Sequence, residues 1–226
     1  MKYIVANWKS NKDKSQVETW MDEFEKDSYS KQIAKDRTVV IAPAMPELYQ
    51  VSQRLSDKEN HPHTFLGVQD ISPFSAGSYT GAVSAQNLEG FSVRYAIVGH
   101  SERRKYFGES DQDVANKVDQ CLTSDITPLV CVDEGYILEQ ARSIADSALK
   151  KCIVAYEPLS AIGTGDEMNP NKVEKIVTEI KRYFNGALAI YGGSVESDNV
   201  KDYLDICDGV LVGGASLKAK EFKRLI

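Results

Sequence analysis

The feature of this sequence that most constrains its fold is the alternation of short apolar runs with longer amphipathic stretches. Eight runs are apolar almost throughout, rather than at every second position: Tyr3–Trp8, Thr38–Ala42, Thr64–Val68, Tyr95–Val98, Pro128–Val132, Cys152–Tyr156, Ala187–Tyr191 and Gly209–Val212. Runs of this kind are typical of parallel β-strands that are buried on both faces. We therefore predict eight parallel strands.

The stretches between the runs have the spacing of amphipathic helices. Apolar residues recur at i, i+3, i+4 and i+7, as in the set Val17, Trp20, Met21 and Phe24. Eight strand-then-helix units predict one α/β domain over residues 1–226, a single (β/α)₈ barrel with a closed parallel eight-stranded sheet and outer helices. The main alternative is an open doubly wound sheet. That fold usually has a G-x-G-x-x-G motif after its first strand, and this chain has none there.

Composition and charge exclude several classes of function. The net charge of −6 disfavours binding to nucleic acid or to an anionic membrane surface. We find no apolar stretch of 18 residues and no signal-peptide core, so we expect a cytoplasmic protein that stays where it is made. The four cysteines are widely spaced and form no C-x-x-C motif, so we expect reduced thiols and no metal site.

Three chemically useful side chains follow three of the predicted strands. In a barrel of this class the active site lies on the loops after the strands, which is where Lys9, His100 and Glu157 occur. His100 precedes a helical turn whose positive end disfavours an imidazolium. Glu157 ends an apolar strand, where a carboxylate is costly to bury unless it is used or paired. Taken singly, each has an ordinary alternative, as a surface lysine, a hydrogen-bonded core histidine or an ion-paired glutamate.

The loops after the last three strands suggest how a substrate is held. Residues 159–165 form an uncharged, glycine-containing segment that is typical of a mobile lid. Gly192-Gly193 and Gly213-Gly214 follow the seventh and eighth strands, where this fold recurrently builds a phosphate site. Together with the three side chains, these loops favour proton abstraction next to the carbonyl of a small phosphorylated sugar. The glutamate is the expected base, and the histidine and lysine are expected to stabilise the enediolate.

Several segments then resemble one family in its own order. They are Asn7-Trp8-Lys9, Gly99–Arg104 (GHSERR), Ala155–Pro158 (AYEP) with Ala161–Gly165 (AIGTG), Tyr191–Val195 (YGGSV) and Gly209–Leu217 (GVLVGGASL). They resemble the triosephosphate isomerase family, and the resemblance covers essentially the whole chain. It implies a TIM barrel that needs no cofactor or metal. The implied reaction interconverts dihydroxyacetone phosphate and D-glyceraldehyde 3-phosphate, in glycolysis and gluconeogenesis.

The same resemblance implies roles for individual residues. The catalytic residues are Glu157 as the proton shuttle, His100 as the donor to the oxyanions and Lys9 as the neutralising cation. The substrate-binding residues are Asn7, Lys9, Gly163, Ser194, Gly213 and Gly214, the last four through phosphate contacts. Ser101 and Glu102 are similar to residues that support His100 and Lys9. The segment Ser72–Ser84, which includes Gly77–Gly81 (GSYTG), resembles the loop through which the family forms homodimers.

The sequence also departs from the family's pattern. The segments Leu159-Ser160 and Asp166–Met168 are unusual at the two ends of the expected lid. Ala82 replaces a glutamate that is common in the dimer loop, which we expect to remove an intersubunit ion pair with Arg103. His61 and His63 lie in a polar loop, where we expect surface residues.

Two alternative functions remain from the sequence. The first is another phosphate-binding barrel enzyme, although a Schiff-base lyase would need a lysine on a middle strand. The second is a barrel that has lost catalysis and serves as a scaffold.

Overall fold

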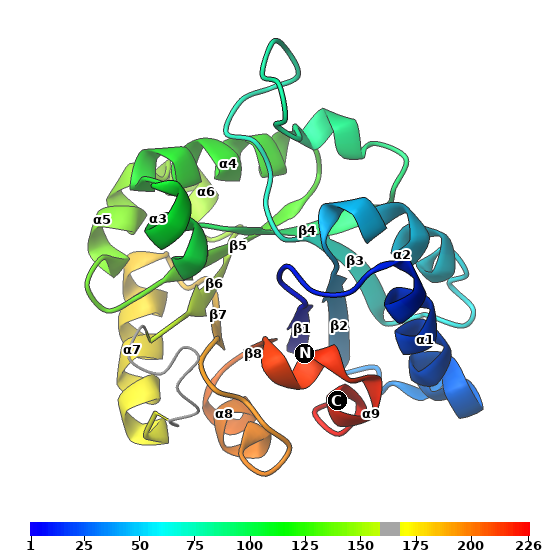
Figure 1. Cartoon of the computed structure of the whole chain (residues 1–226). Helices are drawn as coiled ribbons and strands as arrows, with labels where there is room; N and C mark the ends of the chain where they lie inside the picture. The colour runs from blue at the N-terminus through cyan, green and yellow to red at the C-terminus, as the bar shows by residue number, and fades with distance from the viewer. Residues whose placement is uncertain (159–167) are drawn as a thin grey trace.

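A closed barrel of eight parallel strands lies at the centre of the molecule, with helices around it (Figure 1). The computed structural model describes residues 1–158 and 168–226. The strands are β1 (Lys2–Asn7), β2 (Arg37–Ala42), β3 (Thr64–Val68), β4 (Val93–Val98), β5 (Thr127–Val132), β6 (Ile153–Tyr156), β7 (Leu188–Tyr191) and β8 (Gly209–Val212). Each pairs with the next in the chain, and β8 closes on β1. The predicted barrel is confirmed, and every strand boundary lies within two residues of its predicted position.

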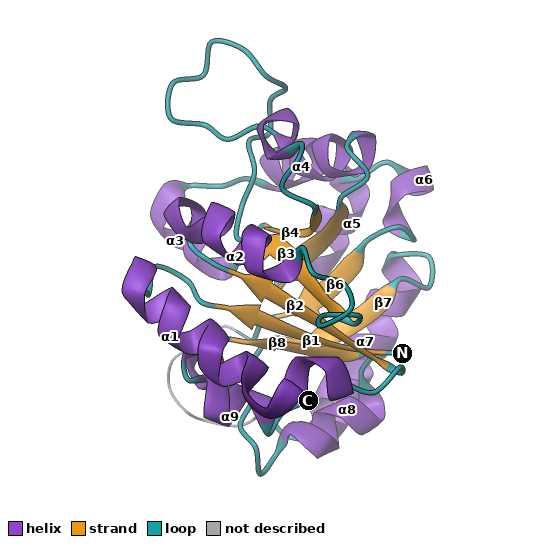
Figure 2. Cartoon of the chain, turned by 90° about the vertical axis from the view of Figure 1, so that its right-hand side faces the viewer, coloured by secondary structure: helices purple, strands orange, loops and turns teal. Residues whose placement is uncertain are grey.

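The helices form the outer layer, as Figure 2 shows from the side. They are α1 (Lys14–Glu25), α2 (Leu48–Leu55), α3 (Ser101–Phe107), α4 (Asp111–Thr123), α5 (Ile137–Ser143), α6 (Asp146–Leu149), α7 (Pro170–Tyr183), α8 (Val200–Ile206) and α9 (Ala219–Lys223), with 3₁₀ turns η1 (Lys26–Gln32), η2 (Met45–Glu47), η3 (Ala85–Leu88) and η4 (Gly214–Leu217). Local signals explain their boundaries. Asp13 and Gln16 form a capping box at the start of α1, and the predicted apolar set of that helix is its buried face.

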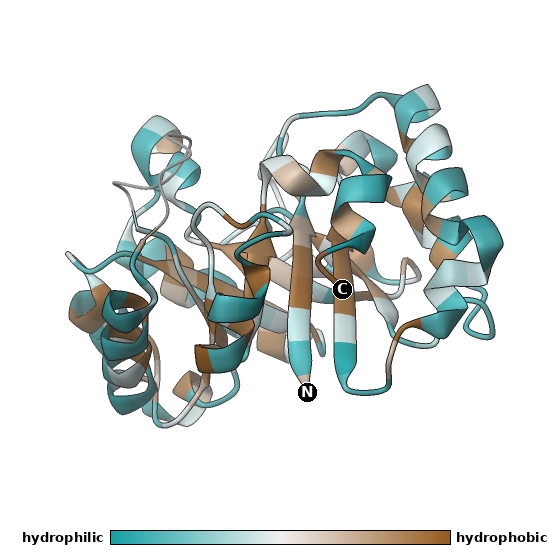
Figure 3. Ribbon diagram, turned by 90° about the horizontal axis from the view of Figure 1, so that it is seen from below, coloured by the Kyte–Doolittle hydropathy of each residue, from teal (hydrophilic) through white to brown (hydrophobic). Residues whose placement is uncertain are grey.

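Alternate residues of each strand belong to different apolar clusters. In β1, Val5 lies in a cluster with Val40, Ile97 and residues of the other strands, whereas Ile4 and Ala6 belong to the larger cluster that includes the helices. Successive side chains of a strand point to opposite faces, so both faces of this sheet are buried. Figure 3 shows the apolar colour along the strands and the polar colour over much of the helices. This double burial is the reason why the strands appear in the sequence as continuous apolar runs.

One segment stands well away from the barrel, at the top of Figures 1 and 2. It connects β3 to η3, and its residues from Phe74 to Ala82 are exposed. The rings of Phe74 and Tyr79 stack on each other with their centroids 4.4 Å apart, although both remain about half-exposed. The connection from Asp70 to Ser84 is rich in Gly, Ser and Pro, which predicts a segment that projects from the barrel, and the structure agrees with this prediction (Figure 1).

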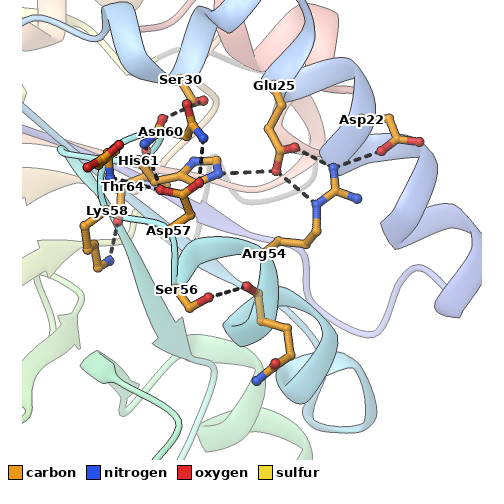
Figure 4. A network of polar contacts seen from close by, with 12 residues as sticks. Asp22, Glu25, Ser30, Arg54, Ser56, Asp57, Lys58, Asn60, His61 and Thr64 are labelled. Carbon is orange, nitrogen blue, oxygen red and sulfur yellow. Dashed lines mark hydrogen bonds and ion pairs between the residues drawn. The ribbon is translucent and has the colours of Figure 1, made fainter.

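The prediction that His61 lies on the surface is wrong. The side chain is 2% exposed, and its Nε2 lies 3.3 Å from Oε1 of Glu25 (Figure 4). Glu25 comes from the end of α1, and Arg54 of α2 donates to both of its carboxylate oxygens. The polar neighbours of His61 in the sequence gave no sign of this burial, because its side-chain partner, Glu25, comes from a helix far away in the sequence. His63 is half-buried.

In the described part of the chain, no helix combines the length and the apolar character that crossing a bilayer requires.

Candidate active site

A cavity of about 330 Å³ lies at the carboxyl ends of the strands. Asn7, Lys9, His100 and Glu157 all line it, together with residues that follow β7 and β8, namely Gly192, Gly193, Ser194, Val195, Glu196, Asp198, Asn199, Leu211, Gly213, Gly214 and Ala215. The structure therefore brings together every predicted site residue that it describes. Gly163 and the predicted lid at residues 159–165 lie outside the described residues.

Glu157 is almost completely buried, and it accepts two hydrogen bonds. Its Oε1 lies 2.9 Å from Nε2 of His100, and its Oε2 accepts from the backbone N–H of Ser101 at 3.0 Å. Burial raises the pKa of the Glu157 carboxyl, but His100 and the Ser101 N–H outweigh burial and hold that pKa below its ordinary value. Glu157 is therefore an ionised carboxylate in the unliganded site.

His100 caps the N-terminus of α3. Its Nδ1 accepts a hydrogen bond from the backbone N–H of Glu102 at 3.2 Å, which requires that Nδ1 carries no proton. The proton of the neutral ring is then on Nε2, where it is donated to Glu157. Burial lowers the pKa of His100, and the nearby carboxylate of Glu157 raises it above its ordinary value. The raised pKa of His100 therefore depends on the contact with the Glu157 carboxylate.

Lys9 reaches into the cavity from the loop after β1. Its Nζ donates to Oε1 of Glu102 at 2.8 Å, so Glu102 supports Lys9 as expected. The backbone of Lys9 has a φ of 53°, which is uncommon for a residue other than glycine. Oδ1 of Asn7 accepts from the backbone N–H of Lys9, and Gln69 donates to its carbonyl at 2.9 Å. Lys9 is thus fixed at both backbone atoms, in a conformation that its own sequence does not favour.

Sequence reasoning missed Gln69 and the contact between Ser101 and Glu157. Gln69 donates to the carbonyls of both Lys9 and Ala42, and so connects the ends of β1, β2 and β3. Its position one residue beyond the apolar run of β3 was the available signal. The backbone N–H of Ser101 donates to Glu157, a contact that its resemblance to a supporting residue did not specify.

Glycines bring the two turns close to the side chains of the site. A Cβ atom on Gly192 would lie 3.1 Å from Cγ of Glu157, and one on Gly213 would lie 3.5 Å from Cε of Lys9. A Cβ atom on Gly214 would meet nothing within 4 Å, so the backbone there is open to a ligand. Bare backbone of this kind allows close approach of an anion.

The described residues contain no group of three or more His, Cys, Asp or Glu side chains that could hold a metal ion. The four cysteines are buried and free. Burial raises the pKa of the Cys131 thiol well above its ordinary value, so this thiol beside Glu157 stays protonated.

Comparison with known proteins gives a consistent result. The family model described as triosephosphate isomerase matches residues 2–226. A triosephosphate isomerase of Mesomycoplasma hyorhinis is 37% identical over 238 residues, covering 99% of this chain and 96% of the relative. One from Mycoplasma pneumoniae is 34% identical and covers 98% of this chain and 96% of its own length. One from Herminiimonas arsenicoxydans is 39% identical, over 83% of this chain and 84% of the relative.

Proposed function

The chain belongs to the triosephosphate isomerase family, and from this premise we propose how its own residues perform the reaction. The protein is an isomerase that interconverts dihydroxyacetone phosphate and D-glyceraldehyde 3-phosphate, a step of glycolysis. The observation that supports the assignment of roles is the convergence of Glu157, His100 and Lys9 on one cavity. We extend the pathway role to gluconeogenesis, because the same reaction runs in both directions.

Glu157 is the base. Its carboxylate removes a proton from C1 of dihydroxyacetone phosphate, and the electron pair of that C–H bond forms the C1–C2 double bond of an enediolate. The negative charge develops on O2, where Nε2–H of His100 donates a hydrogen bond. Return of a proton from Glu157 to C2, with transfer of the O1 proton to O2, gives D-glyceraldehyde 3-phosphate. All atoms are conserved, and no cofactor is needed.

Substrate binding makes Glu157 a stronger base. In the unliganded site Nε2 of His100 donates to Glu157, so a substrate oxygen has to replace the carboxylate at that nitrogen. Glu157 then loses a donor that lowers its pKa, while burial, which raises it, remains. His100 in turn loses the carboxylate that raises its own pKa, so its ring stays neutral while it donates.

The other predicted residues bind the substrate. Lys9 places its ammonium beside the developing enediolate and the phosphate, and Asn7 orients Lys9 through its backbone N–H. Ser194, Gly213 and Gly214 bind the phosphate through backbone N–H groups. Gly163, which lies outside the described residues, is proposed for the same task on the basis of its motif alone.

A coupled assay of glyceraldehyde 3-phosphate turnover tests this function. Wild-type protein should turn over substrate and should incorporate deuterium from heavy water, because Glu157 exchanges its proton with solvent. Glu157→Gln should lose both activities, whereas Glu25→Gln, which changes a partly exposed glutamate at the other end of the barrel, should keep them. A protein that binds substrate without turnover would be a scaffold rather than an enzyme.

We also propose a homodimer formed through the segment Ser72–Ser84. The exposed aromatic pair Phe74 and Tyr79 on this projecting segment supports a partner there. Docking of the segment beside Asn7 and Lys9 of a second copy would hold these residues in place. Analytical ultracentrifugation over a dilution series, with activity followed in parallel, should give the mass of two chains at micromolar concentration. A fully active monomer under those conditions would contradict the proposal.

Three broader assignments complete the proposal. Residues 1–226 form a single domain, and the protein acts in the cytoplasm. Nucleic acid and membranes are not partners, because the chain has a net charge of −6.

A further inference from the structure

A buried tyrosine behind the cavity connects three elements around the phosphate side of the site. Tyr203 lies on α8 and is completely buried. Its ring stacks on that of Tyr191, at the end of β7, with centroids 4.1 Å apart and planes 21° apart. Its hydroxyl donates to the carbonyl of Met168 at 2.8 Å, just before α7 begins. One side chain therefore fixes α8 relative to both the end of β7 and the approach to α7.

The ring of Tyr191 in turn supports the turn after β7. A Cβ atom added to Gly193 would lie 2.1 Å from the hydroxyl oxygen of Tyr191 and 2.4 Å from its Cζ. The backbone of Gly193 therefore rests directly on this ring, and the position of the ring decides where the turn lies. Gly193 and Ser194 both line the cavity.

A third tyrosine extends the same arrangement to β6. Tyr156, which directly precedes Glu157, donates from its hydroxyl to Oε1 of Glu134 at 2.6 Å and lies 3.2 Å from the sulfur of Met168. Met168 is thus held at its carbonyl by one tyrosine and at its side chain by another. Because Tyr156, Tyr191 and Tyr203 are all fully buried, their positions are set by close packing and change together.

We propose that Tyr203 is a positioning residue for the phosphate end of the substrate, a role that rests on the proposed phosphate turn after β7. Its ring holds Tyr191 against Gly193, and its hydroxyl holds the Met168 carbonyl. Tyr203 does not line the cavity, so it acts through these residues and not on the substrate. We expect the ring of Tyr203 to matter more than its hydroxyl, because the ring packs on Tyr191, and Tyr191 supports the backbone of Gly193.

Two substitutions separate the ring from the hydroxyl. Tyr203→Leu removes both, and Tyr203→Phe removes the hydroxyl alone. Tyr29, which is half-buried, provides a control for the hydrogen bond, because its hydroxyl also donates to a backbone carbonyl, that of Lys223, at 2.7 Å. Tyr29 does not line the cavity, so Tyr29→Leu reports the general cost of losing such a tyrosine.

The readouts are KM, kcat and the competitive inhibition constant of inorganic phosphate. For Tyr203→Leu we expect KM and the phosphate constant to rise roughly tenfold, and kcat to change by less than about threefold, because misaligned backbone donors weaken binding of the phosphate. Tyr203→Phe should show a smaller rise in the same two constants. Tyr29→Leu should leave KM and the phosphate constant unchanged. Urea denaturation should show that Tyr29→Leu and Tyr203→Leu are both less stable than the wild type.

Folded Tyr203→Leu with unchanged KM and unchanged phosphate constant would overturn the inference. If Tyr203→Leu does not fold, Tyr203→Met, whose flexible side chain fills more of the space, is measured against the same expectation. Failure of inorganic phosphate to compete with substrate in the wild-type protein would be a different result. It would remove the proposed phosphate site itself, and the inference about Tyr203 with it.

Discussion

A buried histidine contacts a glutamate at each end of the barrel, and the two pairs have very different surroundings. At the carboxyl ends of the strands, His100 lies 2.9 Å from Glu157, and at the amino ends His61 lies 3.3 Å from Glu25. Glu25 also receives two N–H groups of Arg54 (Figure 4). Arg54 in turn contacts two more carboxylates, those of Glu18 and Asp22.

The two clusters differ in whether their polar groups remain free to bind a substrate. Around Arg54 the guanidinium is fully engaged by three carboxylates of the protein itself, those of Glu18, Asp22 and Glu25, and this contact stabilises the packing of α1 against α2. Around Glu157 the donors are a neutral ring and one backbone N–H, and Lys9, whose charge also lowers the pKa of Glu157, lines an open cavity. A cluster whose groups can exchange their partners for a substrate is suited to chemistry, whereas a saturated cluster is suited to stability.

The largest expected effect separates the two glutamates. Glu157→Gln should lower kcat by about 10²–10⁴-fold, the contribution of a general base. Glu157→Asp should lose about 10²-fold, because the carboxylate is pulled back by one methylene. Glu25→Gln and Glu25→Asp should leave kcat near that of the wild type in the same coupled assay. A loss below about fivefold in Glu157→Asp would remove Glu157 from the role of base.

The next largest effect is expected at Lys9, the cation that lines the cavity. Lys9→Ala should cost about 3–4 kcal/mol of transition-state stabilisation, as loss of one oxyanion donor typically does. The measurement is kcat/KM, with Lys12→Ala as control, because Lys12 lies three residues away and contacts the carbonyl of Leu217. Wild-type kcat/KM in Lys9→Ala would make Lys9 an ordinary surface lysine.

Arg54 should show the reverse pattern. Arg54→Ala leaves Glu18, Asp22 and Glu25 without their shared cation, and we expect a loss of about 1–3 kcal/mol in the free energy of unfolding. Urea denaturation measures this loss, and kcat/KM should stay unchanged. Lys9→Ala is the matched variant, with a small effect on stability and a large one on activity. If Arg54→Ala and Lys9→Ala changed the free energy of unfolding and kcat/KM to the same extent, the proposed difference between the two ends of the barrel would be wrong.

The smallest expected effect is a pH dependence of stability. Burial raises the pKa of Glu25, but His61 and Arg54 outweigh burial and hold that pKa below its ordinary value. The resulting stabilisation is therefore complete above the ordinary carboxyl pKa and is lost as pH falls toward the lowered one. Glu25→Gln, which cannot titrate, should lose less stability on acidification than the wild type. Identical acid dependence of the two unfolding free energies would exclude a contribution from Glu25.

Much of the fold and part of the site followed from local sequence. The strands were predictable because burial on both faces makes each of them a continuous apolar run, and the glycine turns after β7 and β8 were visible as motifs. Lys9, His100 and Glu157 could be selected because each follows a strand, and in a parallel barrel all such positions meet at one rim.

The interactions within the site were decided only by the tertiary structure. Glu157 contacts the Ser101 N–H across 56 positions of sequence, and Tyr203 contacts Met168 across 35. His61 was assigned to the surface because its neighbours in the sequence are polar, while its actual partner comes from α1. Sequence determines which groups are available and on which face of an element they lie. Closure of the barrel and packing of its helices determine which of them touch, because hydrogen bonding and burial depend on distances in space that local patterns do not contain.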